Sequence, residues 1–573
     1  MGRPFKEFND EKWEQVRTHP YFEKLRKAIV EQADINMTTE PPRVKFSMIH
    51  DYVITGNREK FESVYNNYFS RLNNYFSAYM LTKDEKYIEP LSDIIWNICD
   101  FESWSIPAHV AEKLSVAERR KNLDLCSTIA GFRLSEVLYF IGDKLPELVR
   151  RRAMAEIRYR VIDSYAQFAP DRYWWPTAKN NWSAVCIAAV LGTYIYAAKD
   201  EEIKTQLPRM IASAECYLAG FEDDCCCLEG YAYWIYGLSF FCVFASLLNE
   251  YTDGEINYFD NPKVRKIAKF QESITLNENE CVSYSDAQIA FRPNSWLSHF
   301  LKGVYPDLKI PAIPSITNPS ATMRYILWQN PDMFESSLNA SEPVSFRFED
   351  AQWFIYRCED YSFACKAGHN KEPHNHNDVG SFMFSKNGKV TLCDPGVGEY
   401  TRQYFSAERY QLMLCSSRGH SVPIINGNYQ VTEGTVIKDG QMEVKRGKAE
   451  IISATENSYS FFMQHVYNDL ALRSLSREFV CMKDSVKLVD KYSFSEPPTS
   501  VVERFVSLIP FEINDGVVSC CGTVISPLNN DGFEVSFGSE IVDRKGGKKE
   551  TVYYADFEVK NLSEKFDVEF IIK

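Results

Sequence analysis

The sequence predicts an α+β multidomain chain, in which a helical domain over residues 1–338 precedes an antiparallel β-sandwich domain over residues 339–573. Three observations support this prediction. Apolar residues recur with a helical period up to about Leu338, and after it they recur at every second position. A turn-rich bridge from Asn330 to Pro343 separates the two patterns, so we expect the domain boundary there.

The helical period is clearest in one stripe of apolar residues, spaced so that all of them fall on one face of a helix. Its members are Leu134, Val137, Leu138, Ile141 and Leu145. Comparable stripes cover residues 61–80, 157–168, 182–198 and 234–249. Loops rich in proline, aspartate and aromatic residues separate these stripes, which predicts helices packed as antiparallel hairpins.

The strand pattern begins with Trp353 and Ile355 and continues through Phe363, Cys365 and Ala367, which alternate with polar positions. Dipeptides that favour tight hairpin turns separate runs of strand length. These dipeptides are Asn387-Gly388, Asn426-Gly427, Asp439-Gly440, Asp515-Gly516 and Asp531-Gly532. Many short antiparallel strands over this length indicate a large β-sandwich.

Composition excludes several classes of protein. With 573 residues, 45% hydrophobic and 25% charged, the chain is too long for one compact core and has ordinary globular composition. Its net charge of -14 argues against nucleic-acid binding and counts mildly against a heavily sulfated substrate. The first residues lack the apolar core of an export signal, and we see no uninterrupted apolar run long enough for a membrane span. We therefore expect a cytoplasmic protein whose 16 cysteines are mostly reduced and buried.

Four ionisable residues gather between strand-like runs and tight turns, namely His374, His376, Asp394 and His420. On an extended backbone, the two imidazoles of a His-x-His pair point to the same face. Two histidines and one aspartate at the ends of neighbouring strands form a plausible zinc set, with water or a fourth group completing the shell. Alternatively, each residue satisfies only a local hydrogen bond.

The same segment resembles the heparinase II/III-like family of polysaccharide lyases. The resemblance rests on His374, His376, Asp378, Gly380, Ser381 and Phe382, on the Asp394-Pro395-Gly396 turn, and on Gly419-His420-Ser421-Val422 leading into Asn426-Gly427. It implies that His374 faces the substrate, and that His376, Asp394 and His420 hold a structural Zn2+. It further implies an (α/α) toroid of helical hairpins followed by a β-sandwich.

A second motif, Asn180-Asn181, opens a predicted helix. Either asparagine could serve as the N-cap that accepts a backbone N–H. A functional alternative is that one carboxamide, together with free N–H groups at the helix start, binds a carboxylate and stabilises extra negative charge on it. The division of roles between Asn180 and Asn181 stays open.

A third motif places Tyr231, Tyr233 and Tyr236 after Glu229-Gly230, at a junction between a loop and a helix. One of these phenols could transfer a proton, while the others pack or stack. In the resembled family, a Glu-Gly-x-x-Tyr pattern carries the catalytic tyrosine, which implies Tyr233 here. A phenol is a competent general acid, and the imidazole of His374 is a group that can accept a proton as a base.

Aromatic and basic side chains in the loops are candidates for contacting a sugar, because sugar rings stack on aromatic faces and arginine pairs with carboxylate or sulfate. The candidates are Trp104, His109, Trp175, Tyr231, Tyr236, Tyr400, Arg402, Tyr404 and Arg418. Core packing is the alternative for the aromatic residues, and exposed salt bridges are the alternative for the arginines.

Together these residues predict a lyase that cleaves uronic-acid-containing glycans, such as glycosaminoglycans, by β-elimination. Its partner would be an acidic oligosaccharide or polysaccharide. Tyr233 would be the acid, and His374 or Tyr233 itself the base, depending on the sugar epimer. Two alternatives remain: a zinc-dependent glycan hydrolase that uses an activated water, and a carbohydrate-binding protein without catalysis. The sequence does not determine the oligomeric state, and it is compatible with a homodimer.

Overall fold

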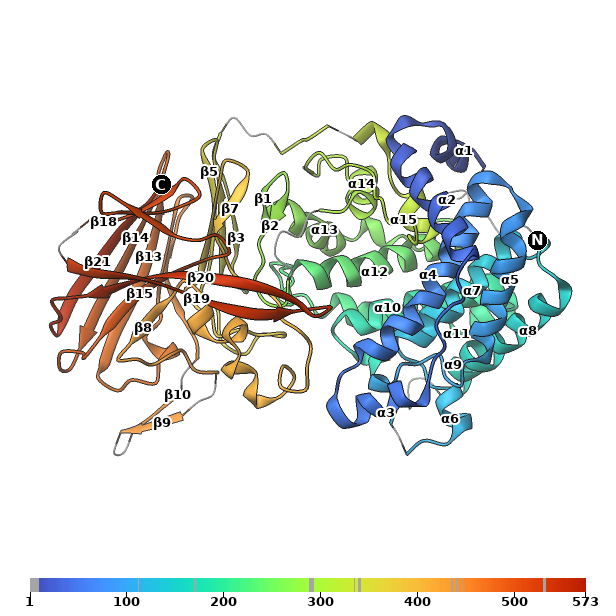
Figure 1. Cartoon of the computed structure of the whole chain (residues 1–573), viewed down its shortest axis with the longest axis horizontal. Coiled ribbons are helices and arrows are strands. Elements are labelled where there is room, and N and C mark those ends of the chain that lie inside the picture. The colour runs from blue at the N-terminus through green and yellow to red at the C-terminus, as the bar shows by residue number, and fades with distance from the viewer. Residues whose placement is uncertain are drawn as a thin grey trace.

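The chain folds into a helical half followed by a half built of antiparallel sheets (Figure 1). This computed structural model describes residues 10–573 except 112, 169–171, 288–292, 334, 339–341, 434–435, 440–441, 446 and 529–531. The order of helices followed by antiparallel strands is therefore confirmed. The predicted boundary between residues 338 and 339 borders the undescribed residues 339–341. The predicted turns Asp439-Gly440 and Asp531-Gly532 each include an undescribed residue and so lie partly outside the described residues.

The helical stripes form helices where the pattern predicts them, and the five members of the first stripe are all buried in or just after α7. The helices are α1 Asp10–Thr18, α2 Glu23–Met37, α3 Phe46–Thr55, α4 Glu59–Thr82, α5 Ile88–Asp100, α6 Val116–Arg120, α7 Leu125–Ile141, α8 Glu147–Ile157, α9 Asp163–Phe168, α10 Asn181–Ala197, α11 Asp200–Leu218, α12 Tyr231–Tyr251, α13 Pro262–Ile274, α14 Ser295–Val304 and α15 Met323–Leu327.

Helices α10 and α12 form the centre of the helical half, where they pack against each other, and α10 also packs against α7 and α11 (Figure 1). Both helices are apolar on nearly all faces because neighbours surround them. Helix α12 is also long and apolar enough to cross a membrane, but 78% of its most apolar window is buried inside the protein. Its environment is that of a core helix.

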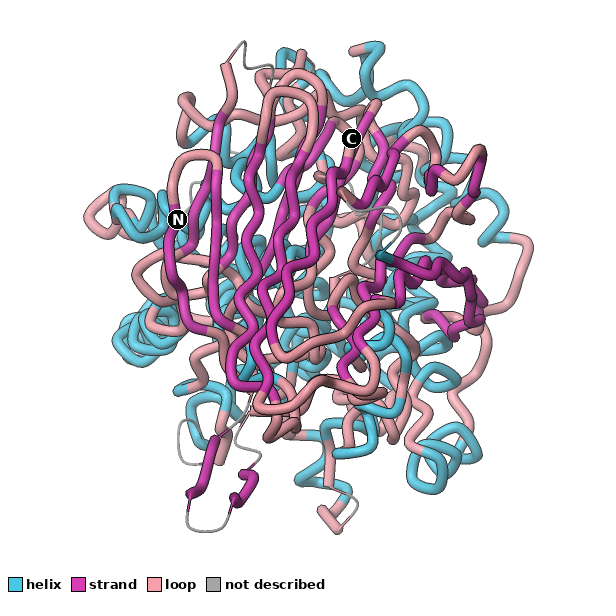
Figure 2. Tube along the Cα trace, turned by 90° about the vertical axis from the view of Figure 1, so that its left-hand side faces the viewer, coloured by secondary structure: helices cyan, strands magenta, loops and turns pink. Residues whose placement is uncertain are grey.

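The strand half contains three larger antiparallel sheets, whose strands Figure 2 shows side by side in front of the helices. The strands are β3 Val344–Phe348, β4 Trp353–Arg357, β5 Tyr361–Lys366, β6 Phe382–Lys386, β7 Lys389–Leu392, β8 Pro423–Ile425, β9 Val436–Asp439, β10 Met442–Lys445, β11 Glu450–Ala454, β12 Ser458–Phe462, β13 Leu472–Cys481, β14 Val486–Phe494, β15 Val501–Ser507, β16 Glu512–Asn514, β17 Val517–Cys520, β18 Thr523–Pro527, β19 Phe533–Arg544, β20 Lys548–Val559 and β21 Lys565–Ile572.

The sheets share one apolar core. The eight-stranded sheet has the order β11-β12-β13-β14-β21-β18-β17-β16, the five-stranded sheet runs β3 to β7, and the four-stranded sheet has the order β19-β20-β15-β8. Phe363 of the five-stranded sheet packs on Phe479 of the eight-stranded sheet at 5.0 Å between ring centroids, and Phe505 packs on Phe570 at the same distance. The sheets thus lie face to face through buried aromatic rings.

Residues 275–281, inside the predicted helical domain, form the hairpin of β1 Thr275–Asn277 and β2 Glu280–Cys281. The hairpin joins the two halves, because Arg357 donates to the Thr275 carbonyl at 2.6 Å and Ser362 donates to the Leu276 carbonyl at 2.6 Å. The helical expectation for this segment is wrong because these contacts with the β3–β7 sheet favour an extended backbone. The loop that follows the hairpin lies at the candidate site.

Candidate functional site

Asp286, in the loop after β2, is the centre of the site. Its buried carboxylate accepts hydrogen bonds from His374 Nδ1 at 2.6 Å, from the Tyr400 hydroxyl at 3.0 Å, and from the Tyr404 hydroxyl. His376 Nε2 lies 3.3 Å from its second oxygen. Burial would raise the pKa of Asp286, but the hydrogen bonds and charges of the two histidines hold it well below its usual range. The carboxylate is therefore ionised and can only accept.

Tyr233 and His374 come from opposite halves of the chain and meet at this carboxylate. Their rings stack with centroids 4.3 Å apart and planes 30° apart, and the Tyr233 hydroxyl lies 3.0 Å from that of Tyr400. The structure thus brings together the two residues that the sequence predicts to share a proton. Asp286 was missed, because a single aspartate in a loop gives no pattern.

The direction of the hydrogen bonds follows from the charge of Asp286. Because its carboxylate only accepts, Tyr400 donates to it, and the Tyr400 oxygen in turn accepts from the Tyr233 hydroxyl. In the same way, His374 donates from Nδ1, which leaves Nε2 as the nitrogen with a lone pair. Burial raises the pKa of Tyr233, so its phenol keeps the proton.

Local backbone geometry fixes both side chains. Tyr233 lies in the first turn of α12, which begins after Gly230 at φ +90°, a conformation that glycine adopts without strain. His374 has φ +57° in a turn after β5, so the extended backbone predicted for the His-x-His pair is wrong. The two imidazoles nonetheless lie on either side of Asp286.

The two asparagines at the start of α10 have different partners. Asn180 is the N-cap, and its side-chain oxygen accepts from the Trp182 backbone N–H at 3.1 Å. The buried Asn181 donates to Glu229 at 3.3 Å. Burial raises the pKa of Glu229, whereas the neighbouring His374 lowers it. The N-cap prediction holds for Asn180, so Asn181 is the better candidate for a carboxylate ligand.

These residues border a cleft of about 700 Å³ between the two halves of the chain. Tyr233 and Glu229 line it from the helical half, and Pro373, next to His374, lines it from the strand half. Both Asn180 and Asn181 also lie on its wall. The volume is that of a typical ligand site. A bound ligand would contact both halves.

His376, Asp394 and His420 form a second, fully buried cluster, in which one ligand atom of each residue lies within 4.8 Å of the others. His420 Nε2 donates to the Leu414 carbonyl at 3.1 Å, which leaves Nδ1 as the lone-pair nitrogen, 3.1 Å from Asp394. His376 Nδ1, His420 Nδ1 and Asp394 Oδ2 have no hydrogen-bond partner among the described residues. Buried and orphaned N and O atoms that converge in this way fit a zinc ion.

Three of the aromatic residues predicted to contact a sugar belong to the core. Trp104 and Trp175 are each 1% exposed, and their indole N–H groups donate to the Ile98 and Leu123 carbonyls. Tyr231 is also 1% exposed and donates to Gln271 at 2.9 Å. A ring without an exposed face cannot stack on a sugar, so this prediction is wrong for all three and the core alternative holds.

Other predicted contacts are distributed over several places. Tyr236 lines a separate cavity of about 120 Å³ in the helical half, and Arg418 pairs with Glu540 at 2.8 Å, as the salt-bridge alternative expects. Arg402 donates to the carbonyls of Val53 and Ile54 at the end of α3. Only Tyr400 and Tyr404 of this group lie at the Asp286 site.

His109 borders a second cleft of about 620 Å³ with Trp174 and Trp182. Its ring packs edge-on against Trp182 at 4.8 Å between centroids, and Trp182 in turn packs on Trp174, which is 58% exposed. These two tryptophans are the accessible rings of this region. The sequence prediction selected Trp175 and not its neighbour Trp174, because position in a loop does not reveal which ring faces outward.

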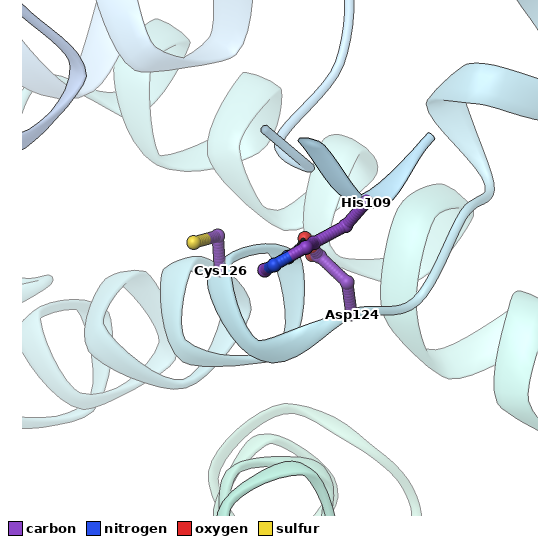
Figure 3. Close-up of side chains that lie close together, drawn as sticks. All are labelled: His109, Asp124 and Cys126. Carbon is purple, nitrogen blue, oxygen red and sulfur yellow. Dashed lines mark hydrogen bonds and ion pairs between the residues drawn. The ribbon is translucent and has the colours of Figure 1, made fainter. Parts of the chain in front are cut away.

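A third cluster consists of His109, Asp124 and Cys126 (Figure 3). Asp124 caps α7 by accepting from the Ser127 N–H at 2.7 Å, and its other oxygen lies 2.8 Å from His109 Nδ1. Burial raises the pKa of the Cys126 thiol well above its usual value, so the sulfur stays protonated. The hydrogen bonds of Asp124 thus account for the cluster without a metal, and they orient His109 toward Trp182.

Comparison with known proteins supports the resemblance. Residues 340–481 match the family model described as Heparinase II/III-like, C-terminal, and this range contains His374, His376, Asp394 and His420. The resemblance predicted from the motifs is thereby confirmed for this part of the chain. No curated protein matches the sequence significantly.

Solved structures share the fold at low sequence identity. A mutant of the heparan sulfate lyase HepC from Pedobacter heparinus aligns over 99% of this chain and 93% of its own, with 12% identity and a TM-score of 0.61. A heparinase III structure aligns over 98% and 91%, also with 12% identity and a TM-score of 0.61. The chondroitin AC lyase of Streptomyces coelicolor A3, in complex with chondroitin sulphate, aligns over 98% and 82%, with 10% identity and a TM-score of 0.57. At these identities the likeness establishes a common fold.

Proposed function

We propose that this chain, whose residues 340–481 form a heparinase II/III-like C-terminal domain, is a polysaccharide lyase that cleaves uronic-acid-containing glycans by β-elimination. One observation carries the proposal. Tyr233 from the helical half and His374 from the strand half stack on each other beside a cleft of about 700 Å³. One buried carboxylate bonds His374 directly and Tyr233 through Tyr400.

The base in this scheme is His374. Asp286 accepts the Nδ1 proton and so fixes the tautomer in which Nε2 carries the lone pair. Nε2 removes the proton from C5 of the uronic acid, and the electron pair of the broken C–H bond forms the C4–C5 double bond. Asp286 also stabilises the imidazolium that results. Since burial raises the pKa of Tyr233, the phenol is a poor base, which favours His374 of the two predicted candidates.

The acid is Tyr233. As the C4–O4 bond breaks, the departing oxygen takes the phenolic proton and the product leaves as a neutral hydroxyl. A phenolate then forms 3.0 Å from the Tyr400 oxygen, and Tyr400 would turn its single hydroxyl proton from Asp286 to that phenolate. Return of the proton from the imidazolium through solvent restores the starting state. Protons and electron pairs therefore balance without an oxidant or a reductant.

Removal of the C5 proton requires stabilisation of the sugar carboxylate, which becomes enolate-like. Asn181 supplies an amide N–H at the wall of the cleft. Glu229 beside it has a raised pKa because it is buried. A protonated Glu229 would donate a second hydrogen bond to the same carboxylate, whereas Asn180 would hold the start of α10 in place as its cap.

Zinc would have a structural role in this protein. His376, Asp394 and His420 would hold the ion. The ion would rigidly connect the turn that carries His374 and His376 to Asp394, which follows β7. All three side chains are fully buried, so the ion would not meet substrate. This burial argues against the alternative of a zinc hydrolase, in which a metal-bound water must reach the scissile bond. The proton-transfer pair argues against a protein that only binds carbohydrate.

We also infer the finer architecture and the substrate class from the same resemblance. The helical hairpins would form an (α/α) toroid, and the face-to-face sheets would form a β-sandwich. The structural neighbours include a heparan sulfate lyase and a chondroitin AC lyase. Acidic glycans such as hyaluronan, chondroitin and heparan are therefore the first substrates to offer.

Product masses test the proposal. Purified protein is incubated with defined oligosaccharides of hyaluronan, chondroitin, heparan and alginate, and the products are weighed by mass spectrometry. Elimination divides the mass of the substrate between two products, whereas hydrolysis adds one water to the total. We expect product pairs without the added water for at least one glycan. Products that contain the added water would show a hydrolase, and binding without cleavage of any glycan would support the binding protein.

A further inference from the structure

The long hairpin of β19 and β20 reaches from the strand half across to the helical half (Figure 1). Its tip is Lys545-Gly546-Gly547, in which both glycines have positive φ. The Gly546 N–H donates to Glu59 at the start of α4 at 3.2 Å. The tip therefore touches the helical half.

The end of the hairpin is anchored to the loop that carries Tyr400. Arg544 donates to the Val397 carbonyl at 2.5 Å, and the Glu399 N–H donates to the Asp543 carbonyl at 3.1 Å. Asp543 and Arg544 directly precede the tip residue Lys545, and Val397 and Glu399 lie just before Tyr400 in the chain. The position of Lys545 relative to Tyr400 is thus fixed by one side-chain and one backbone hydrogen bond.

Lys545 itself lies over the site. Its Nζ is 4.0 Å from the centroid of the Tyr400 ring, and Tyr400 is the residue bonded to Tyr233. Over the residues that the structure describes, Nζ forms no hydrogen bond or ion pair. By contrast, Lys549 on the same hairpin lies 3.7 Å from Asp543, and Arg544 pairs with Glu550 at 2.9 Å. The charge of Lys545 is therefore available to a ligand.

A second cation approaches the same point from the helical half. Burial raises the pKa of Tyr233 and lowers that of Lys545. The charge of Arg58, directly before α4, has a smaller effect and lowers both pKa values. Its guanidinium also pairs with Glu62. The carboxylates of Asp286, Glu59 and Glu62 also act on Lys545, so Lys545 is the cation of this region that lies over the site.

We propose that Lys545 binds an anionic group of the sugar next to Tyr233 and so contributes to substrate specificity. The inference rests on the proposed function, because it assigns an acidic glycan to the cleft. The anion is a carboxylate or a sulfate, since both carry charge that an ammonium can neutralise. The charge of Lys545 also opposes, at this point, the net charge of -14, which would repel such a substrate.

The competing explanation is that the hairpin is only a clasp between the halves. Both explanations predict that loss of the hairpin damages the protein, so the test changes the charge alone. Lys545→Ala and Lys545→Arg are compared with Lys549→Ala, a lysine of the same hairpin that already has a partner. Binding is measured in a Tyr233→Phe background by isothermal titration calorimetry, at low and high salt, with one unsulfated and one sulfated uronate oligosaccharide of equal length.

We expect Lys545→Ala to weaken binding about tenfold at low salt and much less at high salt, whereas Lys545→Arg and Lys549→Ala stay within about twofold. Equal losses on both oligosaccharides identify a carboxylate, and a loss confined to the sulfated one identifies a sulfate. Unchanged affinity of Lys545→Ala for both, with an unchanged melting temperature, would overturn the inference. Equal losses from Lys545→Ala and Lys549→Ala would also overturn it in favour of the clasp. The proposed function fails separately, if the unmutated protein cleaves none of the glycans.

Discussion

At the scale of single residues, Asp286 determines what the two candidate catalytic groups can do. It accepts from His374, Tyr400 and Tyr404, so it orients the base directly and the acid through Tyr400. The backbone fixes where these two side chains lie, and the buried charge fixes the direction of their hydrogen bonds. The chemistry therefore depends on a residue that would not itself need to touch the substrate.

Asp286→Asn tests this dependence. An asparagine in the same place can donate its N–H to His374 and so favour the wrong tautomer, with the proton on Nε2. We expect kcat to fall by about a hundredfold or more, with a much smaller change in substrate affinity. Steady-state kinetics measures both quantities. An Asp286→Asn protein that keeps its kcat would show that His374 is not the base.

Glu503 gives the molecule a pH-dependent stability. It lies 3.0 Å from Arg477, which also pairs with Asp490. Burial and the Asp490 charge raise the pKa of Glu503 to about 8, against the opposing effect of Arg477. Because the folded state binds this proton more tightly than the unfolded state does, the stabilisation is complete below about pH 4 and is lost as the pH rises through about 8.

Glu503→Gln removes this titration. Between about pH 5 and pH 8, we expect the melting temperature of the unmutated protein to fall relative to that of the variant, as measured by differential scanning fluorimetry across the range. Glu569→Gln, in a half-exposed pair with Lys487, serves as the control. Its melting temperature should change with pH in parallel with that of the unmutated protein. Parallel curves for Glu503→Gln as well would contradict the assignment.

At the scale of elements, the site is assembled at the N-terminal ends of two buried helices and at the end of one long hairpin. Helix α10 presents Asn181, helix α12 presents Tyr233, and the β19–β20 hairpin presents Lys545. The two helices are held by apolar packing on nearly all sides, so their first turns are rigid. Catalytic side chains on rigid elements need little reordering when a substrate binds.

Gly230 is a point where a single added methyl group would disturb this arrangement. At φ +90° a Cβ would lie 2.7 Å from the Tyr284 carbonyl oxygen. We expect Gly230→Ala to destabilise the protein by about 1–3 kcal/mol and to reduce kcat, because the start of α12 must shift and moves Tyr233 with it. Chemical denaturation and steady-state kinetics measure the two effects.

Gly388 provides the matched control. It has a similar positive φ, but a Cβ there meets nothing within 4 Å. Gly388→Ala should cost less stability and leave kcat unchanged. If both variants lose activity equally, the position of the α12 start is not what limits catalysis.

At the scale of the whole molecule, two separately predictable halves form a cleft that neither half contains alone. The periodicity change near Leu338 predicted the helices and the antiparallel strands, because periodic burial of one face is a local property of the sequence. The motifs predicted Tyr233, His374 and the Asn180-Asn181 pair, which the structure brings to one cleft, and the buried cluster; their catalytic and metal-binding roles stay predictions. Asp286 and Lys545 were beyond reach, since their roles arise only from contacts between segments far apart in the chain. The burial of Trp104 and Trp175 was unpredictable for the same reason.

Metal removal tests how the strand half is held together. Without an ion, the three ligand atoms of His376, Asp394 and His420 would stay buried without a hydrogen-bond partner among the described residues, which costs stability. We expect treatment with a chelator to lower the melting temperature and the rate together, and zinc to restore both. A stripped protein, shown metal-free by elemental analysis, that keeps both properties would contradict the structural role of zinc.

The central claim is elimination by a tyrosine and a histidine that meet across the two halves of the chain. Its most direct test is the ultraviolet absorbance of a conjugated C4–C5 double bond, followed when the purified protein and its Tyr233→Phe variant are mixed with the same uronate oligosaccharide. The account predicts a steady rise in absorbance with the unmutated protein and a rate at least about a hundredfold lower with the variant. Cleavage without this absorbance, or equal rates for the two proteins, would contradict it.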